Sequence, residues 1–295
     1  MLHRELLNKI YRHGGYQAFK INDPKPRDIH KANIRDRLVH HAIYKILYPY
    51  FDRKFIYDSY SCRIGKGTHR AMNRFRNFSW KVSKNNTLTI WILKCDIRKF
   101  FASIDHNILE NILAKYIDDS DTLWLLGQII GSFNSENFRG VGLPLGNLTS
   151  QLLVNIYMNE FDQFIKRKLK IKYYIRYADD FVFMSENRNL LKNILSEIKN
   201  FLRSKLKIRP HPDKVYIKTL ASGIDFLGWI HFPDHRILRN ATKWRMYRKL
   251  SEHPTNKTYQ SYKGLLEHGN TWKIERKLER LYIKTNRNIG KYSKI

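Results

Sequence analysis

The segment Tyr173–Met184 constrains the fold of this chain most, because two aromatic-rich apolar halves flank the adjacent acids Asp179 and Asp180. Strand-forming residues around a tight polar break predict a β-hairpin with both acids at its turn. Neighbouring carboxylates repel one another unless a cation lies on them. An isolated Asp-Asp pair is most often a solvated turn, whereas a divalent-metal site requires a third carboxylate from elsewhere in the chain.

Asp96 is the candidate for that third acid. It directly follows residues 88–95, a nearly continuous apolar run with the length of a buried central strand. Adjacent strands of one sheet can bring Asp96 and Asp179 together. Hard cations such as Mg²⁺ take oxygen ligands, and a pair of them can drive an in-line displacement at phosphorus. The three acids therefore predict a two-metal site, although Asp96 alone is more simply explained as an acid that caps a turn.

The charge balance points to a polyanionic partner. The chain has 55 Lys+Arg against 26 Asp+Glu, a formal net charge of +29. Such a field concentrates nucleic acid first and an anionic membrane surface second. No apolar run approaches the ~20 residues of a membrane-spanning helix, so no membrane partner is expected. Two cysteines make no disulfide framework or zinc spacing, and residues 1–7 lack an apolar signal-peptide core, so we expect a cytoplasmic protein.

Hydrophobic spacing gives the remaining elements. We expect short helices and loops over residues 1–35, and a strand and then a strand or hairpin over 214–220 and 224–232. Helices are expected over about 35–55, 71–80, 106–116, 122–133, 149–169 and 190–202. The C-terminal residues 236–295 are helical in pattern and carry 16 Lys+Arg against 4 Asp+Glu.

Three motifs in order resemble those of reverse transcriptases: Asp96-x-x-x-x-Phe101, Gly146-x-x-x-Ser150 and Tyr177-Ala-Asp-Asp180. The basic loop Ser61–Arg70 and the segment Phe226-Leu227-Gly228-Trp229 resemble the fingers motif and the primer grip. The similarity runs from about residue 35 to 232. It implies an α+β right-hand polymerase, with no room in the chain for an RNase H, maturase or endonuclease domain.

The resemblance also implies a division into fingers, palm and thumb. The fingers would comprise residues 1–95, interwoven with the palm. The palm, an antiparallel sheet with helices, would comprise 96–232, with part of 106–145 open between palm and fingers. Residues 233–295 would form a basic helical thumb.

Site roles follow from the same resemblance. Asp96 and Asp179 would bind two Mg²⁺ ions, or Mn²⁺, with Asp180 assisting and the Ile97 carbonyl as a further ligand. The nucleotide site would include Arg63, Lys66, Phe101, Leu145 and Gly146. Lys214 would protonate pyrophosphate, although it is one of several nearby lysines and could be an ordinary surface residue.

Phe101 and Leu145 bear on which polymerase this is. A ring at position 101 would exclude a 2′-OH and favour dNTPs. Most reverse transcriptases have Gln where Leu145 stands and Pro where Gln151 stands. The pattern here is similar to error-prone reverse transcriptases of diversity-generating retroelements, and loss of a hydrogen-bond check next to the nucleotide would lower fidelity. Ala178 instead resembles group II intron enzymes.

The sequence therefore predicts an RNA-directed DNA polymerase, bacterial, archaeal or phage-encoded, that makes error-prone cDNA for a diversity-generating retroelement. Its expected partners are template RNA, the RNA/cDNA duplex, dNTPs and a small basic accessory protein, either monomeric or oligomeric. Retron-like, group II intron-like and antiphage-defence reverse transcriptases remain alternatives. A non-catalytic RNA-binding protein would not need the three acids, and Phe101 disfavours an RNA-dependent RNA polymerase.

Overall fold

The chain folds into two compact units, each assembled from separated segments. The computed structural model describes residues 1–22, 26–136 and 138–292. Unit 1 comprises Met1–Gly67, Leu93–Phe183 and Asn189–Tyr216. Unit 2 comprises Thr68–Ile92, Met184–Arg188 and Ile217–Ile295. The division into fingers, palm and thumb is functional and stays a prediction.

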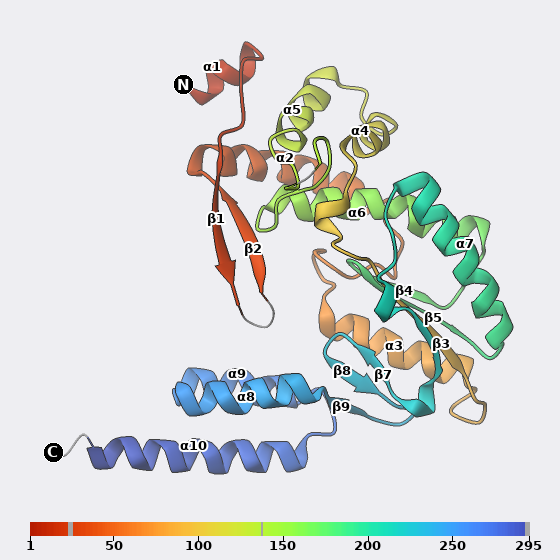
Figure 1. Cartoon of the computed structure of the whole chain (residues 1–295), viewed down its shortest axis with the longest axis vertical. Coiled ribbons are helices and arrows are strands. Elements are labelled where there is room, and N and C mark those ends of the chain that lie inside the picture. The colour runs from red at the N-terminus through yellow and green to blue at the C-terminus, as the bar shows by residue number, and fades with distance from the viewer. Residues whose placement is uncertain (23–25, 137, 293–295) are drawn as a thin grey trace. The chain divides into compact units, whose positions relative to one another are not determined.

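The helices follow the 3.6-residue patterns of the sequence, and each helix predicted after residue 35 is present (Figure 1). They are α1 (Leu2–Leu7), α2 (Ile34–Asp52), α3 (Thr68–Val82), α4 (His106–Ala114), α5 (Ser120–Ile130), α6 (Leu148–Gln163), α7 (Arg188–Leu206), α8 (Asn240–Glu252), α9 (Asn256–Leu266) and α10 (Trp272–Tyr292). A π-helical turn, η2 (Phe164–Lys168), extends α6. Asp105 caps the N-terminus of α4, since its carboxylate accepts from the backbone N–H of Ile108 at 3.0 Å.

The strands form three small sheets within the described residues. They are β1 (Tyr16–Ile21), β2 (Arg27–Ala32), β3 (Trp91–Asp96), β4 (Tyr174–Tyr177), β5 (Asp180–Ser185), β6 (Tyr216–Thr219), β7 (Ile224–Phe226), β8 (Trp229–His231) and β9 (Arg236–Leu238). The sheets have the orders β1-β2, β4-β5-β3-β6 and β7-β8-β9. The apolar run before Asp96 is β3, an inner strand whose residues 92–95 are buried, as expected.

The N-terminal hairpin differs from the prediction. Short helices and loops were expected over residues 1–35, but β1 and β2 pair antiparallel from Tyr16↔Ala32 to Ile21↔Arg27. That expectation is wrong because nearly every side chain of β1 is exposed. A strand without a buried face carries no alternation of apolar and polar residues for the sequence to reveal.

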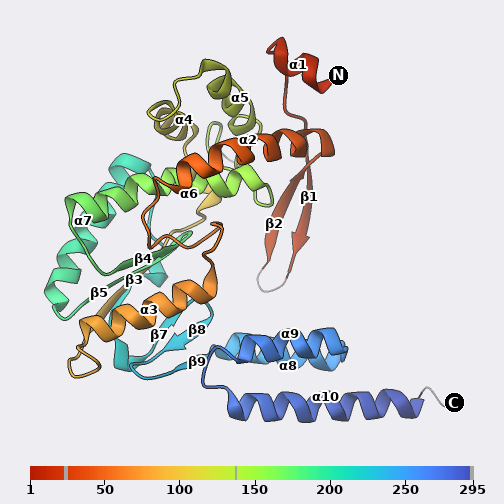
Figure 2. The ribbon, with the colours of Figure 1, turned by 180° about the vertical axis from the view of Figure 1, so that it is seen from behind.

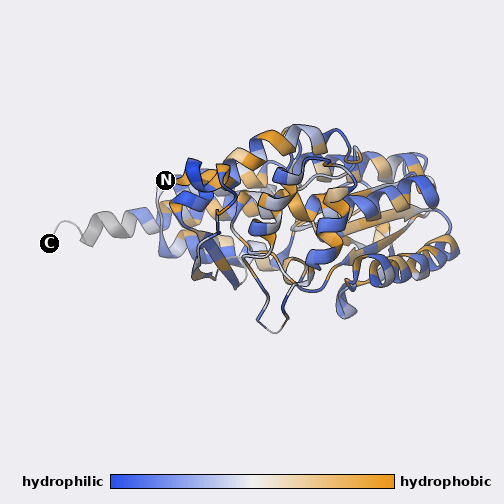
Figure 3. Ribbon diagram, turned by 90° about the horizontal axis from the view of Figure 1, so that it is seen from above, coloured by the Kyte–Doolittle hydropathy of each residue, from blue (hydrophilic) through white to orange (hydrophobic). Residues whose placement is uncertain are grey.

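Unit 1 is built around α6, whose side chains are buried on almost every side. Helix α2 packs along it, and the two run side by side in the view from behind (Figure 2). This packing therefore holds residues 34–52 against the helix that follows Gly146. Coloured by hydropathy, the helices show apolar and polar residues on different sides, as amphipathic packing requires (Figure 3).

Unit 2 has its own apolar core. Helices α8, α9 and α10 pack on one another and on the β7-β8-β9 sheet (Figure 1). The buried members of this core are Met72, Trp229, Leu238, Met246, Leu250, Leu266 and Leu278. Within the described residues, no helix combines the length and the apolarity needed to cross a membrane.

Candidate active site

The β4–β5 hairpin presents the two adjacent acids at its turn, as the sequence predicts. The strands pair from Tyr174↔Phe183 to Tyr177↔Asp180, which leaves Ala178 and Asp179 as a two-residue loop. Ala178 has φ +54°, in the left-handed region. A non-glycine residue there costs about 1–2 kcal/mol, so the surrounding structure must hold this turn in place.

Arg176, in the middle of β4, supplies that support. Its fully buried guanidinium donates to both oxygens of Asp162 in α6 at 2.7–3.0 Å and to the carbonyl of Ala178 at 3.2 Å. Asn155 accepts a further bond at 3.2 Å, and the Tyr174 hydroxyl donates to the same Asp162 at 2.7 Å. A closed network of buried, satisfied polar groups therefore fixes the turn to the central helix of unit 1.

Asp96 joins the turn through the adjacent strand. The backbone N–H of Ile97 donates to the carbonyl of Asp179 at 3.2 Å, so the end of β3 meets the start of β5. On the other side, the N–H of His211 donates to the carbonyl of Asp96 at 2.7 Å. The structure thus brings Asp96, Asp179 and Asp180 to one end of the sheet.

Two lysines neutralise part of this negative charge. Lys94 precedes Asp96 by two positions on β3, and its buried ammonium lies 3.1 Å from Asp180. Lys214 ends a short 3-10 helix, η3 (Pro212–Lys214), and its ammonium lies 3.0 Å from Asp96. Among the described residues, Asp179 forms no ion pair with a lysine or arginine, so this carboxylate differs from Asp96 and Asp180.

Burial and mutual repulsion raise the proton affinity of two of the acids. Burial, and then the charge of Asp96, raises the pKa of Asp179, while Lys214 and Arg27 act in the opposite direction. Burial raises the pKa of Asp180 to about 7 even though Lys94 opposes the shift. The cluster therefore holds more negative charge than its lysines balance, which favours a bound cation.

The donor set suits a hard divalent cation. Carboxylate oxygens are the ligands that Mg²⁺ prefers, and Asp180 Oδ1 is buried without a hydrogen-bond partner in the described part of the chain. Among those residues, no three His, Cys, Asp or Glu side chains already stand in metal-binding geometry. Asp96 and Asp180 each engage a lysine, so a metal would share or displace these contacts.

The loop that carries Leu145 is fastened to β2. The His30 N–H donates to the carbonyl of Leu145 at 2.8 Å, and Asn147 bonds the His30 carbonyl at 2.7 Å and the Ala32 N–H at 3.2 Å. Gly146 has φ +106°, and a Cβ there would lie 2.7 Å from Ile29. Only glycine permits this close approach. The N-terminal hairpin and the Leu145 loop are therefore packed directly against each other.

Phe101 lies beside the same loop. It begins the 3-10 helix η1 (Phe101–Ser103), and its carbonyl accepts from the Leu143 N–H at 2.8 Å. Phe100 is buried, whereas Phe101 is partly exposed. Of the two adjacent rings, Phe101 is therefore the one with surface available to a ligand. Gln151, on the first turn of α6, is also partly exposed.

The basic loop Ser61–Arg70 follows α2, and its side chains are held mainly by contacts with residues close by in the chain. Arg63, with a nearly buried side chain, donates to the Asp52 carboxylate at 2.6 Å and to carbonyls of Asp52, Ile56 and Ser59. Lys66 lies 3.5 Å from the Tyr57 ring centroid and donates to its carbonyl at 2.9 Å. The geometry gives Arg63 a supporting role, and direct contact with a triphosphate stays a prediction.

The segment predicted as primer grip forms the β7–β8 hairpin of unit 2. Phe226 pairs with Trp229 across a two-residue turn in which Leu227 has φ +53° and Gly228 φ +88°. Both aromatic side chains are buried, and Leu227 packs on the core of unit 2. The turn backbone is therefore the part of this motif that is open to a ligand.

Sequence reasoning missed three residues of this site. Arg176 and Lys94 are cations inside apolar strands, a signal that a buried partner exists, but the partners lie on other elements and only the fold identifies them. Arg27 is an exposed residue of β2 whose charge acts on Asp179. It was missed because the hairpin that carries it was not predicted.

Comparisons with known proteins identify the family. The family model described as reverse transcriptase (RNA-dependent DNA polymerase) matches residues 20–231, more than half of the chain. The chain belongs to the reverse transcriptase family. The resemblance found in the sequence is thereby confirmed, and the match begins earlier than expected, in β1.

Relatives include intron-encoded proteins. The chain is 27% identical to protein YkfC of Escherichia coli, over 76% of this chain and 66% of that protein. It is 23% identical to the group II intron-encoded protein LtrA of Lactococcus lactis, over 76% of this chain and 46% of that protein. The chain thus spans less than two thirds of these relatives.

Solved structures agree on the fold. Telomerase from Candida albicans, in complex with a fragment of telomeric RNA, superposes with a TM-score of 0.60 at 11% identity, over 96% of this chain and 56% of that one. Apo telomerase from Candida tropicalis gives 0.59 at 14% identity, over 93% and 57%. The α+β right-hand polymerase fold is confirmed.

Proposed function

We propose that the chain is an RNA-directed DNA polymerase that extends a primer 3′-OH with dNTPs on an RNA template. The observation that carries the proposal is the meeting of Asp96 with the Asp179-Asp180 turn at one end of a buried sheet, in a chain of the reverse transcriptase family. A protein that only bound RNA would have no need to crowd three partly buried acids.

Asp96 and Asp179 hold the metals in this proposal, with the carbonyl of Ile97 as a further ligand. Two bound Mg²⁺ ions would lower the pKa of the primer 3′-OH and neutralise negative charge on the triphosphate. Asp180 pairs with the buried Lys94, which orients it and keeps it beside Asp179. Its role is to shape the charge of the site as much as to bind metal.

In this proposal, basic side chains around the three acids bind the triphosphate. Arg27 is exposed and acts on Asp179, and Lys214 keeps 42% of its side chain exposed while it pairs with Asp96. We assign Arg27 to the phosphates beside the predicted Lys66, and Lys214 to protonation of the departing pyrophosphate. Phe101, next to the Leu145 loop, would exclude a 2′-OH.

The biological role we propose is error-prone cDNA synthesis for a diversity-generating retroelement, on the basis of Leu145 and Gln151. Ala178 and the intron-encoded relatives favour a group II intron-like enzyme as the second candidate. In either case the expected partners are a structured template RNA and its cDNA duplex. The first role also calls for a small basic accessory protein.

The proposed domains follow from these roles. The fingers would lie within residues 1–95 and the palm within 96–232, and the basic helices after Phe232 would hold duplex phosphates. Affinity for the duplex should therefore fall steeply with salt.

Primer extension on an RNA template, with sequencing of the product, tests this function. We expect extension with dNTPs and Mg²⁺, and much weaker extension with NTPs. Frequent errors at template adenines would support the retroelement role, and faithful copying the intron-like one. RNA binding without extension under any of these conditions would refute the polymerase.

A further inference from the structure

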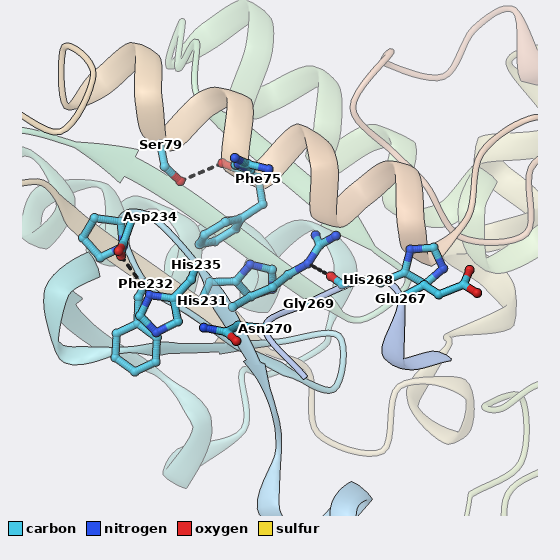
Figure 4. Close-up of a pocket in the computed structure, with 13 residues that line it drawn as sticks. Phe75, Ser79, His231, Phe232, Asp234, His235, Glu267, His268, Gly269 and Asn270 are labelled. Atoms are coloured by element: carbon cyan, nitrogen blue, oxygen red, sulfur yellow. Dashed lines mark hydrogen bonds and ion pairs between the residues drawn. The ribbon is translucent and has the colours of Figure 1, made fainter. Parts of the chain in front are cut away.

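A cavity of about 380 Å³ lies within unit 2 (Figure 4). Three segments line it: one side of α3, the turn between β8 and β9, and the loop between α9 and α10. It is separate from the primer-grip turn, because Leu227-Gly228 precedes β8 and the cavity turn follows it. None of the roles assigned above uses this cavity.

Two arginines line the cavity without an acidic partner. Arg76 rests on the Trp80 ring at 4.3 Å, and Arg236 donates from Nε to the carbonyl of His268. Neither forms an ion pair with a carboxylate in the described part of the chain. Burial, and then the charge of Arg76, lowers the pKa of Arg236. Arg236 is partly buried and Arg76 is exposed at the opening of the cavity. Two like charges placed this close favour an anion that lies between them.

The acids at the rim do not neutralise this pair. Asp234 engages His235 at 2.9 Å and is otherwise largely exposed, and Glu267 is exposed. Solvent screens both charges, whereas Arg236 is partly desolvated. The partly buried charge of the cavity is therefore that of Arg236, and its exposed edge carries Arg76 together with the two acids.

An aromatic stack stands beside the arginines. The Phe232 and His235 rings are 4.9 Å apart and nearly parallel, at 12°, and His235 keeps 39% of its side chain exposed. The Asn270 side chain is exposed at the same rim, and its side-chain amide makes no hydrogen bond within the described residues. A ring platform with an amide beside it suits a nucleobase, which stacks by its face and bonds by its edge.

We propose that this cavity binds one nucleotide unit, with the phosphate between Arg76 and Arg236 and the base against the Phe232–His235 stack. The unit is either a residue of single-stranded RNA or a free nucleoside monophosphate. The volume of the cavity lies within the range of small-ligand sites, about 300–1,000 Å³. The inference does not rest on the polymerase reaction, because binding is measured without extension.

Photolabelling of the full chain with 8-azidoadenosine 5′-monophosphate, followed by peptide mapping, tests the site. We expect labelling in residues 231–236 or 267–270. Arg76→Gln should reduce this labelling about fivefold or more, because a charge-assisted phosphate contact is lost. Lys81→Gln is the matched control: it removes a charge from an exposed position of the same helix, outside the cavity, and should leave labelling within about twofold.

A variant of opposite sign protects the test against misfolding. Asp234→Asn removes a rim charge that repels phosphate, so labelling should rise about two- to threefold. Unlabelled adenosine should compete poorly against AMP, since it has no phosphate. Competition by single-stranded hexa-adenylate at far lower concentration than AMP identifies RNA as the source, and equal potency identifies the free nucleotide.

Three results would overturn the site. They are labelling that maps outside these peptides, equal labelling of the Arg76→Gln and Lys81→Gln variants, and adenosine that competes as well as AMP. Loss of primer extension has no bearing on these outcomes, so failure of the site and failure of the polymerase are distinguishable.

Discussion

The β4–β5 and β7–β8 hairpins share a backbone design and differ in what holds them. Each has a two-residue turn that opens with a non-glycine residue at positive φ, Ala178 at +54° and Leu227 at +53°. The first turn is fixed by the buried charges of Arg176 and Asp162, and it displays carboxylates. The second is fixed by buried Phe226 and Trp229, and it displays backbone.

The difference shows that turn geometry does not decide function. A turn surrounded by a satisfied charge network can keep acids crowded at a fixed position, because the network resists their repulsion. The β7–β8 turn is held by buried aromatic side chains. It presents the same strained backbone to a ligand without concentrating charge. The two hairpins should therefore respond differently when their anchors are removed.

Removal of the charged anchor should have the largest effect on stability. Arg176→Met leaves Asp162 buried and uncompensated, which we expect to cost about 4 kcal/mol in the free energy of unfolding. The double variant Arg176→Met/Asp162→Leu should recover most of that stability but not primer extension, since Ala178 loses its support. Denaturant unfolding and extension assays measure the two effects. Full recovery of activity in the double variant would show that the network does not position the turn.

Removal of Trp229, which anchors the β7–β8 turn, should lower the free energy of unfolding by slightly less. A second substitution should not restore the lost stability. Trp229→Ala opens a cavity in the core of unit 2, for which we expect about 3 kcal/mol in denaturant unfolding. No single partner substitution restores it, because Trp229 packs on many apolar side chains rather than on one charge. Gly269→Ala is a related change, since a Cβ there would collide with the same indole. A loss well under 1 kcal/mol in Trp229→Ala would show that this hairpin is not held by aromatic burial.

The acid at the first turn should make metal-free stability depend on pH. Since the pKa of Asp180 is raised to about 7 in the folded chain, its contribution is greatest below pH 4 and is lost as pH rises through 7. The free energy of unfolding of the wild type, minus that of Asp180→Asn, should fall over this window by an amount on the order of 4 kcal/mol. Thermal unfolding in a chelator measures it. A difference that grows with pH would contradict the raised pKa.

Leu145→Gln should change fidelity and leave stability within about 0.5 kcal/mol, because Leu145 is only partly buried. The added amide can check the position of the incoming nucleotide, so errors on an RNA template should become rarer. Sequencing of cDNA from both enzymes gives the error spectrum. An unchanged spectrum would remove Leu145 from the explanation of fidelity.

Much of the fold was predictable because its elements bury one face. The run before Asp96 and the amphipathic helices carry that burial as hydrophobic periodicity, and Asp105 marks a helix start. The β1–β2 hairpin was not predictable in the same way, since its strands are largely exposed. Its missing prediction also hid Arg27.

The site was predictable in its acids but not in its cations. Asp96 and the Asp179-Asp180 pair stand at strand ends, where sequence alone suggests convergence. Lys94 and Arg176 depend on strand order and on α6, which periodicity does not reveal. The resemblance to reverse transcriptases predicts Arg63 as a triphosphate ligand, and its contacts with Asp52 are visible only in three dimensions.

Primer extension by Asp179→Asn on an RNA template, with dNTPs and Mg²⁺, tests the central claim most directly. The matched control is Asp213→Asn, which removes a largely exposed carboxylate of the same unit. We expect Asp179→Asn to lose at least about 1000-fold in extension rate, or about 4 kcal/mol of transition-state stabilisation, while RNA binding and the control stay unchanged. Extension by Asp179→Asn at more than about a tenth of the wild-type rate would contradict a catalytic role for this turn.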